Sequence, residues 1–433
     1  MTIFYLLKLR KVIRITTDFE KYLDNYIEVI VKKGLNLQPG QRLLIMSAFD
    51  PGVPKELTSF IRKIVKQAYK GGAKFVEVMW RDDEIELMKF KYDNEESLKE
   101  YPFWRLQTAE RFLEIGDALL FIYAENPDLY REIDPQMLST AQLTMFKHLE
   151  PLLGKISKNL SSWVMVSAPI KGWAEKLLPD TPPTERINRF WDVIFDICRV
   201  KNENPIAAWE DHIKHLKSRS EYLNKKHYSE LRLTAPGTDL TIVLPEGHIW
   251  MSGSETNVNG IEFIANIPTE EIFTLPHKDK VNGFVTSTKP LFFGGRFAED
   301  FKLTFREGKL IQVTARKGED FLNGMIKTDD GSSRLGEIAL VPHSSPISSY
   351  NKLFYNILID ENASNHIALG NAYRSSITKG ESMTDDEFSK VGGNLSGIHI
   401  DLMVGSEQMY VDGILKNGDI EPIMKNGEWA FKI

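Results

Sequence analysis

The sequence contains very little cysteine and no long apolar segment. Cys198 is the single cysteine among 433 residues, so an internal disulfide and a zinc site with several thiolates are both excluded. The longest apolar run, residues 118–124, is far shorter than the roughly 20 residues that a membrane-spanning helix needs. Any metal site must therefore consist mainly of histidine and carboxylate ligands, which 9 histidines and 60 acidic residues can supply.

The sequence also lacks an excess of charge of one sign. Its 54 basic and 60 acidic residues give a net charge of −6, without long single-sign blocks. We therefore expect neither a nucleic acid nor a membrane as a partner. Residues 1–17 place their basic residues after an apolar stretch, the reverse of a secretory signal, so we treat them as an unassigned leader and expect a cytoplasmic protein.

The first half of the chain alternates between strand-like and helix-like segments. Short apolar runs, typical of buried strands, occur at residues 42–47, 74–80, 117–123 and 163–167. Helical spacing of apolar residues lies between them, for example at 56–69. Strands separated by helices indicate βαβ units. We therefore predict an N-terminal α/β domain with a mainly parallel sheet over residues 18–205.

The second half has a different texture. Short strands separated by tight turns are predicted at residues 230–234, 240–244, 283–287, 302–305 and 310–314. The length alone suggests about three domains, but the pattern changes only once, near a predicted helix at 204–226. We therefore predict two domains, the second being an α+β domain rich in antiparallel strands over residues 206–433.

Several common catalytic signatures are absent. The sequence contains no Gly-x-Gly-x-x-Gly and no P-loop, and no Gly-x-Ser-x-Gly of a nucleophile elbow. Cys198 lies in an apolar run and is expected to be a buried thiol. His212 and His215 are three apart in a helix rich in charged residues, and we expect them on a solvated face. Because the nucleophile elbow is missing, a serine hydrolase is disfavoured.

One strand carries a notable pair of polar residues. His399 and Asp401 lie two apart in the alternating run at 398–404, so their side chains share a face. An imidazole and a carboxylate in an apolar strand must be paired or bind a cation. The pattern leaves both interpretations open, a metal site and an ordinary buried His–Asp hydrogen bond.

Other candidates have weaker individual signals. His366 and Tyr373 are seven apart and would share a face if their segment were helical, which Gly370 makes uncertain. Glu337 stands at the start of an apolar strand, and Glu270 and Glu271 lie in a loop between two prolines. Most glutamates are solvated, so none of these residues defines a site by itself.

Taken together, these segments resemble the thermophilic-type metallo-aminopeptidase family. The resemblance covers residues 18–433 and rests on long strings in a fixed order. They are N-x-P-T-E-E-x-F-T-x-P at 266–276, L-G-E-I-A-L-V at 335–341, D-E-N-A-S-x-H-I-A-x-G-x-A-Y at 360–373, and G-G-N followed by H-x-D at 392–401. The run G-L-x-L-x-P-G-Q at 34–41 also fits the family, whereas residues 1–17 do not.

The resemblance implies a ligand set and an activity. The family's five metal ligands fall on Glu271, Glu337, His366, His399 and Asp401, and its active-site tyrosine falls on Tyr373. It also implies a homodimer with a C-terminal catalytic domain, and an internal cavity that restricts access to short peptides with a free N-terminus.

Elementary chemistry agrees with this ligand set. Two imidazoles and three carboxylates suit two adjacent divalent ions, with Asp401 the expected bridging ligand. Such a centre activates water and polarises a carbonyl. Zinc, cobalt, manganese and magnesium all remain open. Glu270, Glu271 or Glu337 could accept the proton of the water, with Glu337 preferred, and Tyr373 could stabilise the oxyanion or orient a ligand.

We therefore expect a metal-dependent aminopeptidase. Two alternatives remain: a metallohydrolase that acts on another amide, and a peptide- or metal-binding protein without turnover.

Overall fold

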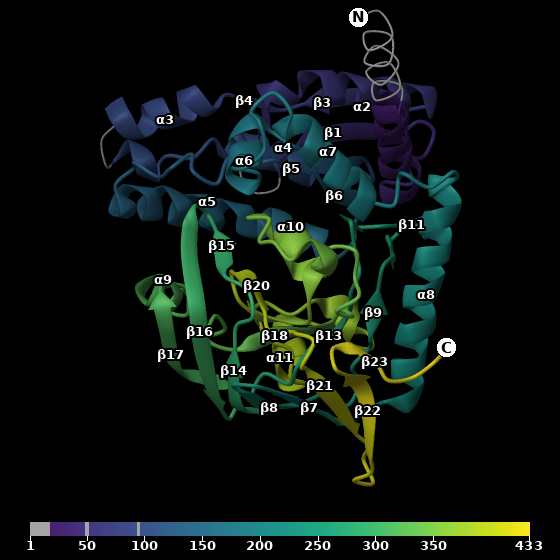
Figure 1. The fold of residues 1–433 in the computed structure, drawn as a ribbon, viewed down its shortest axis with the longest axis vertical. Helices are drawn as coiled ribbons and strands as arrows, with labels where there is room; N and C mark the ends of the chain where they lie inside the picture. Colours follow the sequence, from purple (N-terminus) through teal and green to yellow (C-terminus); the bar gives the residue numbers. More distant parts are fainter. Residues whose placement is uncertain (1–17, 48–51, 93–95) are drawn as a thin grey trace, which may run out of the picture.

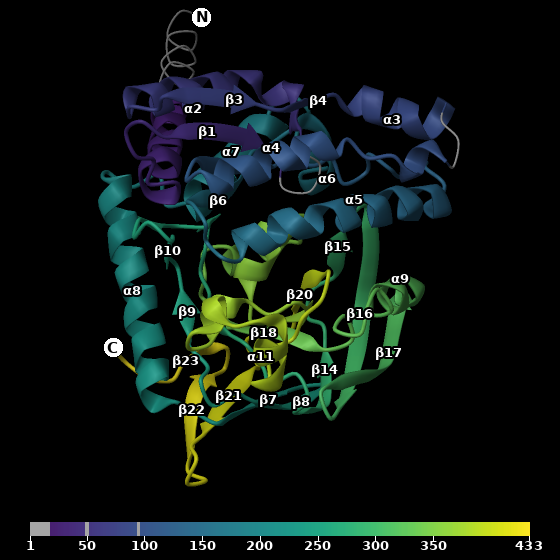
Figure 2. The ribbon, with the colours of Figure 1, turned by 180° about the vertical axis from the view of Figure 1, so that it is seen from behind.

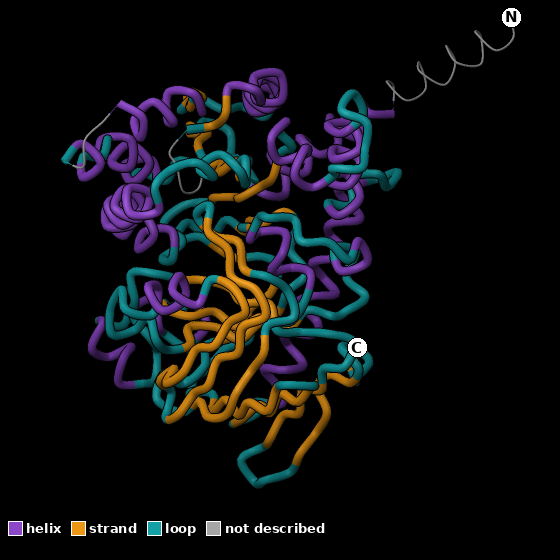
Figure 3. Tube along the Cα trace, turned by 60° about the vertical axis from the view of Figure 1, so that its left-hand side comes forward, coloured by secondary structure: helices purple, strands orange, loops and turns teal. Residues whose placement is uncertain are grey.

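The computed structural model describes residues 18–47, 52–92 and 96–433, so the leader predicted at residues 1–17 lies outside the described part. The chain forms two halves, one above the other in Figure 1. Helices predominate in the first half and strands in the second (Figure 3). No helix in the described ranges is both long enough and apolar enough to cross a bilayer.

The first half is built on a five-stranded parallel sheet with the order β12-β6-β5-β1-β3. Its strands are β1 (Arg42–Met46), β3 (Phe75–Val78), β5 (Ala118–Tyr123), β6 (Trp163–Ser167) and β12 (Asn266–Ile267). All of β5 is buried, as expected for a central parallel strand covered on both faces. Strand β12 comes from the second half of the sequence and pairs Ile267 with Val166.

Helices cover both faces of this sheet. They are residues 18–29, the π-helical turn η1 (Ile30–Gly34), α2 (Thr58–Lys70), α3 (Asp83–Tyr92), α4 (Phe103–Glu114), α5 (Pro135–Ile156), α6 (Lys171–Leu177) and α7 (Arg186–Ile197), with the 3-10 turns η2 (Lys55–Leu57) and η3 (Ser97–Lys99). Leu44 packs in one cluster with α4 and α5, whereas Leu43 packs on the other face with α2 and α7. A short parallel pair, β2 (Val53–Pro54) and β4 (Trp80–Arg81), lies beside them.

Helix α8 (Pro205–Lys226) follows the first half and runs along the side of the second (Figure 2). The Asn204 side chain accepts a hydrogen bond from the Ala207 N–H and caps the helix, and His227 ends it in a left-handed conformation. The hydroxyls of Ser220 and Ser252 lie 3.1 Å apart and join α8 to β9 (Met251–Ser252).

The second half contains two larger antiparallel sheets. One has nine strands: β7 (Glu230–Ala235), β8 (Thr238–Val243), β14 (Val281–Thr286), β15 (Leu291–Phe293), β16 (Arg296–Arg306), β17 (Lys309–Lys317), β21 (Tyr410–Ile414), β22 (Ile420–Lys425) and β23 (Glu428–Trp429). The other has the order β20-β19-β18-β13-β9, where the new strands are β20 (His399–Met403), β19 (His366–Gly370), β18 (Leu335–Leu340) and β13 (Ile272–Thr274). The predicted fold class, an α/β part followed by an α+β part rich in antiparallel strands, is confirmed.

Short elements complete the second half. They are the strand pair β10 (Glu255–Thr256) and β11 (Glu262–Phe263), the helices α9 (Glu319–Met325), α10 (Ile357–Asp360) and α11 (Asp385–Lys390), and the 3-10 turns η4 (Ser348–Tyr350), η5 (Glu361–Ala363), η6 (Arg374–Ser376) and η7 (Gly380–Ser382). Helix α10 lies directly below α5 in Figure 1, where the two halves meet.

Candidate metal centre

The five candidate ligands lie on one face of the antiparallel five-stranded sheet of the second half, β20-β19-β18-β13-β9. The register pairs Glu337 on β18 with Ala368 on β19, and Ala368 in turn with Asp401 on β20. His366 shares the face of Ala368 because alternate residues of a strand point the same way. His399 lies opposite Gly370, and Glu271 directly precedes β13. Four neighbouring strands therefore bring together residues that are up to 130 positions apart in the sequence.

The ligand atoms form two overlapping groups. Nε2 of His366 lies 3.1 Å from Oε2 of Glu271 and 3.5 Å from Oε1 of Glu337. Nε2 of His399 lies 3.4 Å from Oδ1 of Asp401 and 3.6 Å from Oε2 of Glu337. Glu337 is the carboxylate common to both groups. Oδ1 of Asp401, the expected bridging ligand, lies 4.0 Å from Nε2 of His366 as well, so Asp401 also faces both histidines.

The charge of this donor set fits divalent cations. Glu271, Glu337 and Asp401 are all buried, and no lysine or arginine among the described residues forms an ion pair with any of them. Burial raises the pKa of Glu337 to about 7. Burial alone would lower the pKa of His399, but Asp401 and Glu337 raise it to about 9. Burying charged carboxylates costs free energy unless a positive charge balances them. Because no lysine or arginine of the described chain does so here, these residues fit a site for metal ions.

Backbone carbonyls orient both histidines. Nδ1 of His399 lies 2.7 Å from the Asn371 carbonyl, and Nδ1 of His366 lies 3.2 Å from the Ser364 carbonyl. A ring nitrogen that donates to a carbonyl leaves the other nitrogen as the free donor to a metal. In both rings that free nitrogen is Nε2, which faces the carboxylates.

Two small residues keep the centre open. Ala368 lies between Glu337 and Asp401 and is fully buried, so a larger side chain would fill the space between the carboxylates. Gly370 has a φ of +105°, and a Cβ there would lie 2.1 Å from the Ile398 carbonyl oxygen. A side chain at Gly370 would therefore displace the backbone that leads into His399.

Tyr373 reaches the same site from a loop. The helix considered for residues 366–373 is wrong, because residues 366–370 form β19 and Gly370 ends the strand. The Tyr373 ring centre lies 4.9 Å from that of His399 and 5.8 Å from that of Phe273. Burial and the nearby carboxylates of Glu337 and Asp401 raise its pKa well above the usual range, so the phenol keeps its proton and can donate it in a hydrogen bond.

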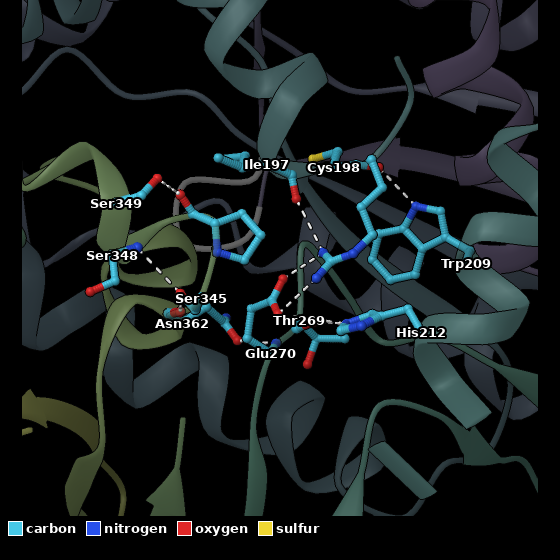
Figure 4. Close-up of polar contacts among 12 residues, drawn as sticks. Ile197, Cys198, Trp209, His212, Thr269, Glu270, Ser345, Ser348, Ser349 and Asn362 are labelled. Atoms are coloured by element: carbon cyan, nitrogen blue, oxygen red, sulfur yellow. Dashed lines mark hydrogen bonds and ion pairs between the residues drawn. The ribbon is translucent and has the colours of Figure 1, made fainter. Parts of the chain in front are cut away.

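Glu270 has a different partner from Glu271. Arg199 holds the Glu270 carboxylate with both guanidinium nitrogens, at 2.5 Å (Nη1–Oε1) and 2.8 Å (Nη2–Oε2). The Glu270 backbone N–H donates to Asn362 Oδ1 at 2.6 Å (Figure 4). Glu270 belongs to neither candidate ligand group. Because Arg199 already neutralises its carboxylate, Glu270 is the least suited of the three candidate bases.

His212 belongs to the same network, contrary to the expectation of a solvated helix face. Its side chain is 12% exposed, and Nε2 lies 2.7 Å from the Thr269 carbonyl (Figure 4). His215 does lie on the exposed side of α8, with its side chain 58% exposed. The neighbouring charged residues made the whole segment look polar, although His212 and Trp209 face inward.

Sequence reasoning missed two further carboxylates. Glu361 is buried and lines the cavity beside the ligands, and burial together with Asp401 and Glu271 raises its pKa well above the usual range. Glu255 also lines the cavity and accepts a hydrogen bond from Asn159. Glu361 stands in the string that carries His366, but nothing in the local pattern separates a buried glutamate from a solvated one.

The ligands line a cavity of about 560 Å³ where the two halves meet. Helix α5 contributes Phe146 and Leu149, the parallel sheet contributes Phe121 and Met165, and the remaining walls come from the second half. The walls are mainly apolar around a few convergent polar groups, which is the usual composition of a small-molecule site.

A buried group of histidines and carboxylates, at a cavity between an α/β half and an antiparallel half, defines a metal-dependent enzyme site. The chain belongs to the thermophilic metalloprotease (M29) family, whose model matches residues 19–429. The predicted resemblance is therefore confirmed.

Similar proteins cover nearly the whole chain. Aminopeptidase 2 of Geobacillus stearothermophilus is 43% identical over 96% of this chain and 99% of its own length. Aminopeptidase AmpS of Bacillus subtilis (strain 168) is 43% identical over 96% of this chain and 100% of its own. The structure of wild-type AmpT from Thermus thermophilus matches with a TM-score of 0.87 at 35% identity, covering 95% of this chain and 100% of that one.

Proposed function

We propose that the chain is an aminopeptidase that removes the N-terminal residue from short peptides at a centre of two divalent ions. Glu271, Glu337 and His366 would hold one ion, and Glu337, His399 and Asp401 the other. The observation that carries the proposal is the pair of overlapping histidine-carboxylate groups in a chain of the M29 family. The aminopeptidase names of its relatives supply the reaction class.

Two bound ions would supply an acidic water and a polarised scissile carbonyl. Glu337 is the proposed proton acceptor provided that one of its oxygens is only loosely coordinated, since one oxygen faces each histidine. Glu361 is the alternative, since it lines the cavity without belonging to either ligand group. Tyr373 is proposed to donate its phenolic hydrogen to the developing oxyanion.

The roles of the two glutamates can be separated by experiment. We expect Glu337→Gln to lose both metal and activity, because a neutral amide is a poor ligand and no base. If Glu361 is the base instead, Glu361→Gln loses activity while its metal content stays at the wild-type value. Full activity of Glu337→Gln would contradict its proposed role.

The reaction class has a direct test. Amino-acid p-nitroanilides should be cleaved, their N-acetylated forms should not, and chelation followed by divalent metal should remove and restore the rate. Equal cleavage of free and acetylated substrates would favour an amidohydrolase without N-terminal specificity. Metal binding without any turnover would favour the non-catalytic alternative.

The proposal also covers metal identity, cellular location and assembly. Zinc, cobalt, manganese and magnesium all suit the ligand set, and elemental analysis of protein purified without added metal distinguishes them. A cytoplasmic location is consistent with the single cysteine. We propose a homodimer, with domains over residues 18–205 and 206–433, and light scattering would measure the mass of the assembly.

A further inference from the structure

The cavity carries charges of both signs, contributed by different elements. The candidate metal ligands come from the antiparallel five-stranded sheet and its flanking loops. Their carboxylates make that part of the cavity acidic. Two basic residues also line the cavity: Lys147 on α5 and Arg296 at the start of β16. Neither forms an ion pair with a carboxylate of the described residues. Each is therefore free to bind an anion that enters the cavity.

One aromatic contact packs the helix that carries Lys147 against the hairpin that carries Arg296. Phe146, which precedes Lys147, stacks on Phe293 with ring centres 5.7 Å apart and an interplanar angle of 10°. Phe293 is the cross-strand partner of Arg296 in the β15–β16 hairpin. Gln142 adds a hydrogen bond from α5 to the Gly294 carbonyl in the turn of this hairpin.

The Arg296 guanidinium is held against an aromatic ring. It lies 4.7 Å from the centre of the Phe321 ring, and the Arg296 side chain is only half-buried. A cation–π contact uses none of the N–H donors of a guanidinium, so these donors can still bind a carboxylate with two parallel hydrogen bonds. Lys147 is exposed on α5 and adds a second positive charge that does not fix the orientation of the bound carboxylate.

We propose that Arg296, assisted by Lys147, binds the C-terminal carboxylate of a short peptide whose N-terminus lies at the metal ligands. The inference rests on the proposed aminopeptidase function. A short peptide with free ends has an ammonium group at one end and a carboxylate at the other. A cavity with an acidic region and a separate basic region matches that charge distribution, and the match selects peptides short enough to span the two regions.

The test compares peptides with matched C-terminal amides. Di-, tri- and tetrapeptides with a common N-terminal residue are assayed as free acids and as amides, with the wild type, Arg296→Gln and Lys147→Gln. The readout is the ratio of kcat/KM for the acid to kcat/KM for the amide. For the peptide length that spans the cavity, we expect a wild-type ratio of about ten, expressed mainly in KM, because a charge-assisted hydrogen bond has about that effect.

We expect Arg296→Gln to bring the ratio close to one and Lys147→Gln to reduce it by about two- to threefold. Arg306 is the matched control, because it lies at the far end of the same strand, is exposed and does not line the cavity. Arg306→Gln should keep the wild-type ratio.

Two results would overturn the inference: a wild-type ratio near one at every length, or an unchanged ratio in Arg296→Gln. If that unchanged ratio came with equal losses on acid and amide, Arg296 would have only a structural role. Failure of the aminopeptidase function itself has a different signature, since the wild type would then cleave neither acids nor amides.

Discussion

Removal of the Arg199 guanidinium probes the ion pair at Glu270, the residue directly before the candidate metal ligand Glu271. Arg199→Met keeps a side chain of similar length but leaves the Glu270 carboxylate, which is 5% exposed, without its ion pair. The next ionisable group is His212, whose Nε2 lies 3.9 Å away and already contacts the Thr269 carbonyl. Burial lowers the pKa of His212, so its ring does not replace the guanidinium charge. An unpaired buried carboxylate costs about 3–5 kcal/mol, so we expect the free energy of unfolding to fall by that amount.

An exposed pair at the start of α7 provides the matched control. Arg189 and Glu185 lie 3.2 Å apart with side chains 66% and 52% exposed, so Arg189→Met should cost less than about 1 kcal/mol. The double variant Arg199→Met/Glu270→Gln removes the buried charge and should regain part of the stability that the single variant loses. Urea denaturation followed by circular dichroism measures all three variants.

The same substitution should weaken metal binding. Glu270 directly precedes Glu271 in the chain. Substituting a residue that orients a metal ligand typically lowers metal affinity by about 10- to 100-fold. Dialysis against a metal buffer followed by elemental analysis gives the affinity. The reasoning is refuted if Arg199→Met is no less stable than Arg189→Met, or if the double variant is as unstable as Arg199→Met.

Three further predictions address single side chains. Tyr373→Phe should lower kcat by about 10²-fold at unchanged metal content, and a parallel loss of metal would show that Tyr373 orients a ligand instead. Ala368→Leu should abolish metal binding by filling the space between Glu337 and Asp401, and calorimetric titration with zinc that matched the wild type would contradict this. Burial lowers the pKa of His248 from 6.5 to about 4, so between these values the unfolded chain binds a proton that the folded one does not. Stability should therefore fall by about 2 kcal/mol from pH 7 to pH 5, and His248→Gln should lose less over the same range in urea denaturation.

The fold class was predictable because its signals are local. The β1, β5 and β6 segments read as apolar runs, and the helices between them read as apolar residues at helical spacing. Strand β12 was not predictable, because two residues carry no periodicity and their partner, β6, lies about 100 positions earlier. Only long-range packing decides where such a short strand pairs.

The candidate site was predictable through its rare strings and only partly from physical reasoning. The spacing of His399 and Asp401 indicates a shared face whichever neighbours they have. The spacing of His366 and Tyr373 suited a helix, and only the positive φ of Gly370 and the pairing with β20 explain why the strand prevails. The row Glu337–Ala368–Asp401 depends on register between strands, which the sequence of one strand does not encode.

The short strand β12 has a consequence for modularity. Ile267 is hydrogen-bonded into the sheet of the first half, and Glu271 follows four residues later at the candidate metal centre. The second half, produced alone, would retain all five candidate ligands but lose the sheet that anchors the first of them. We therefore expect neither half to be exchangeable between relatives as a unit, and hydrogen exchange at Ile267 should report on the integrity of the reactive centre.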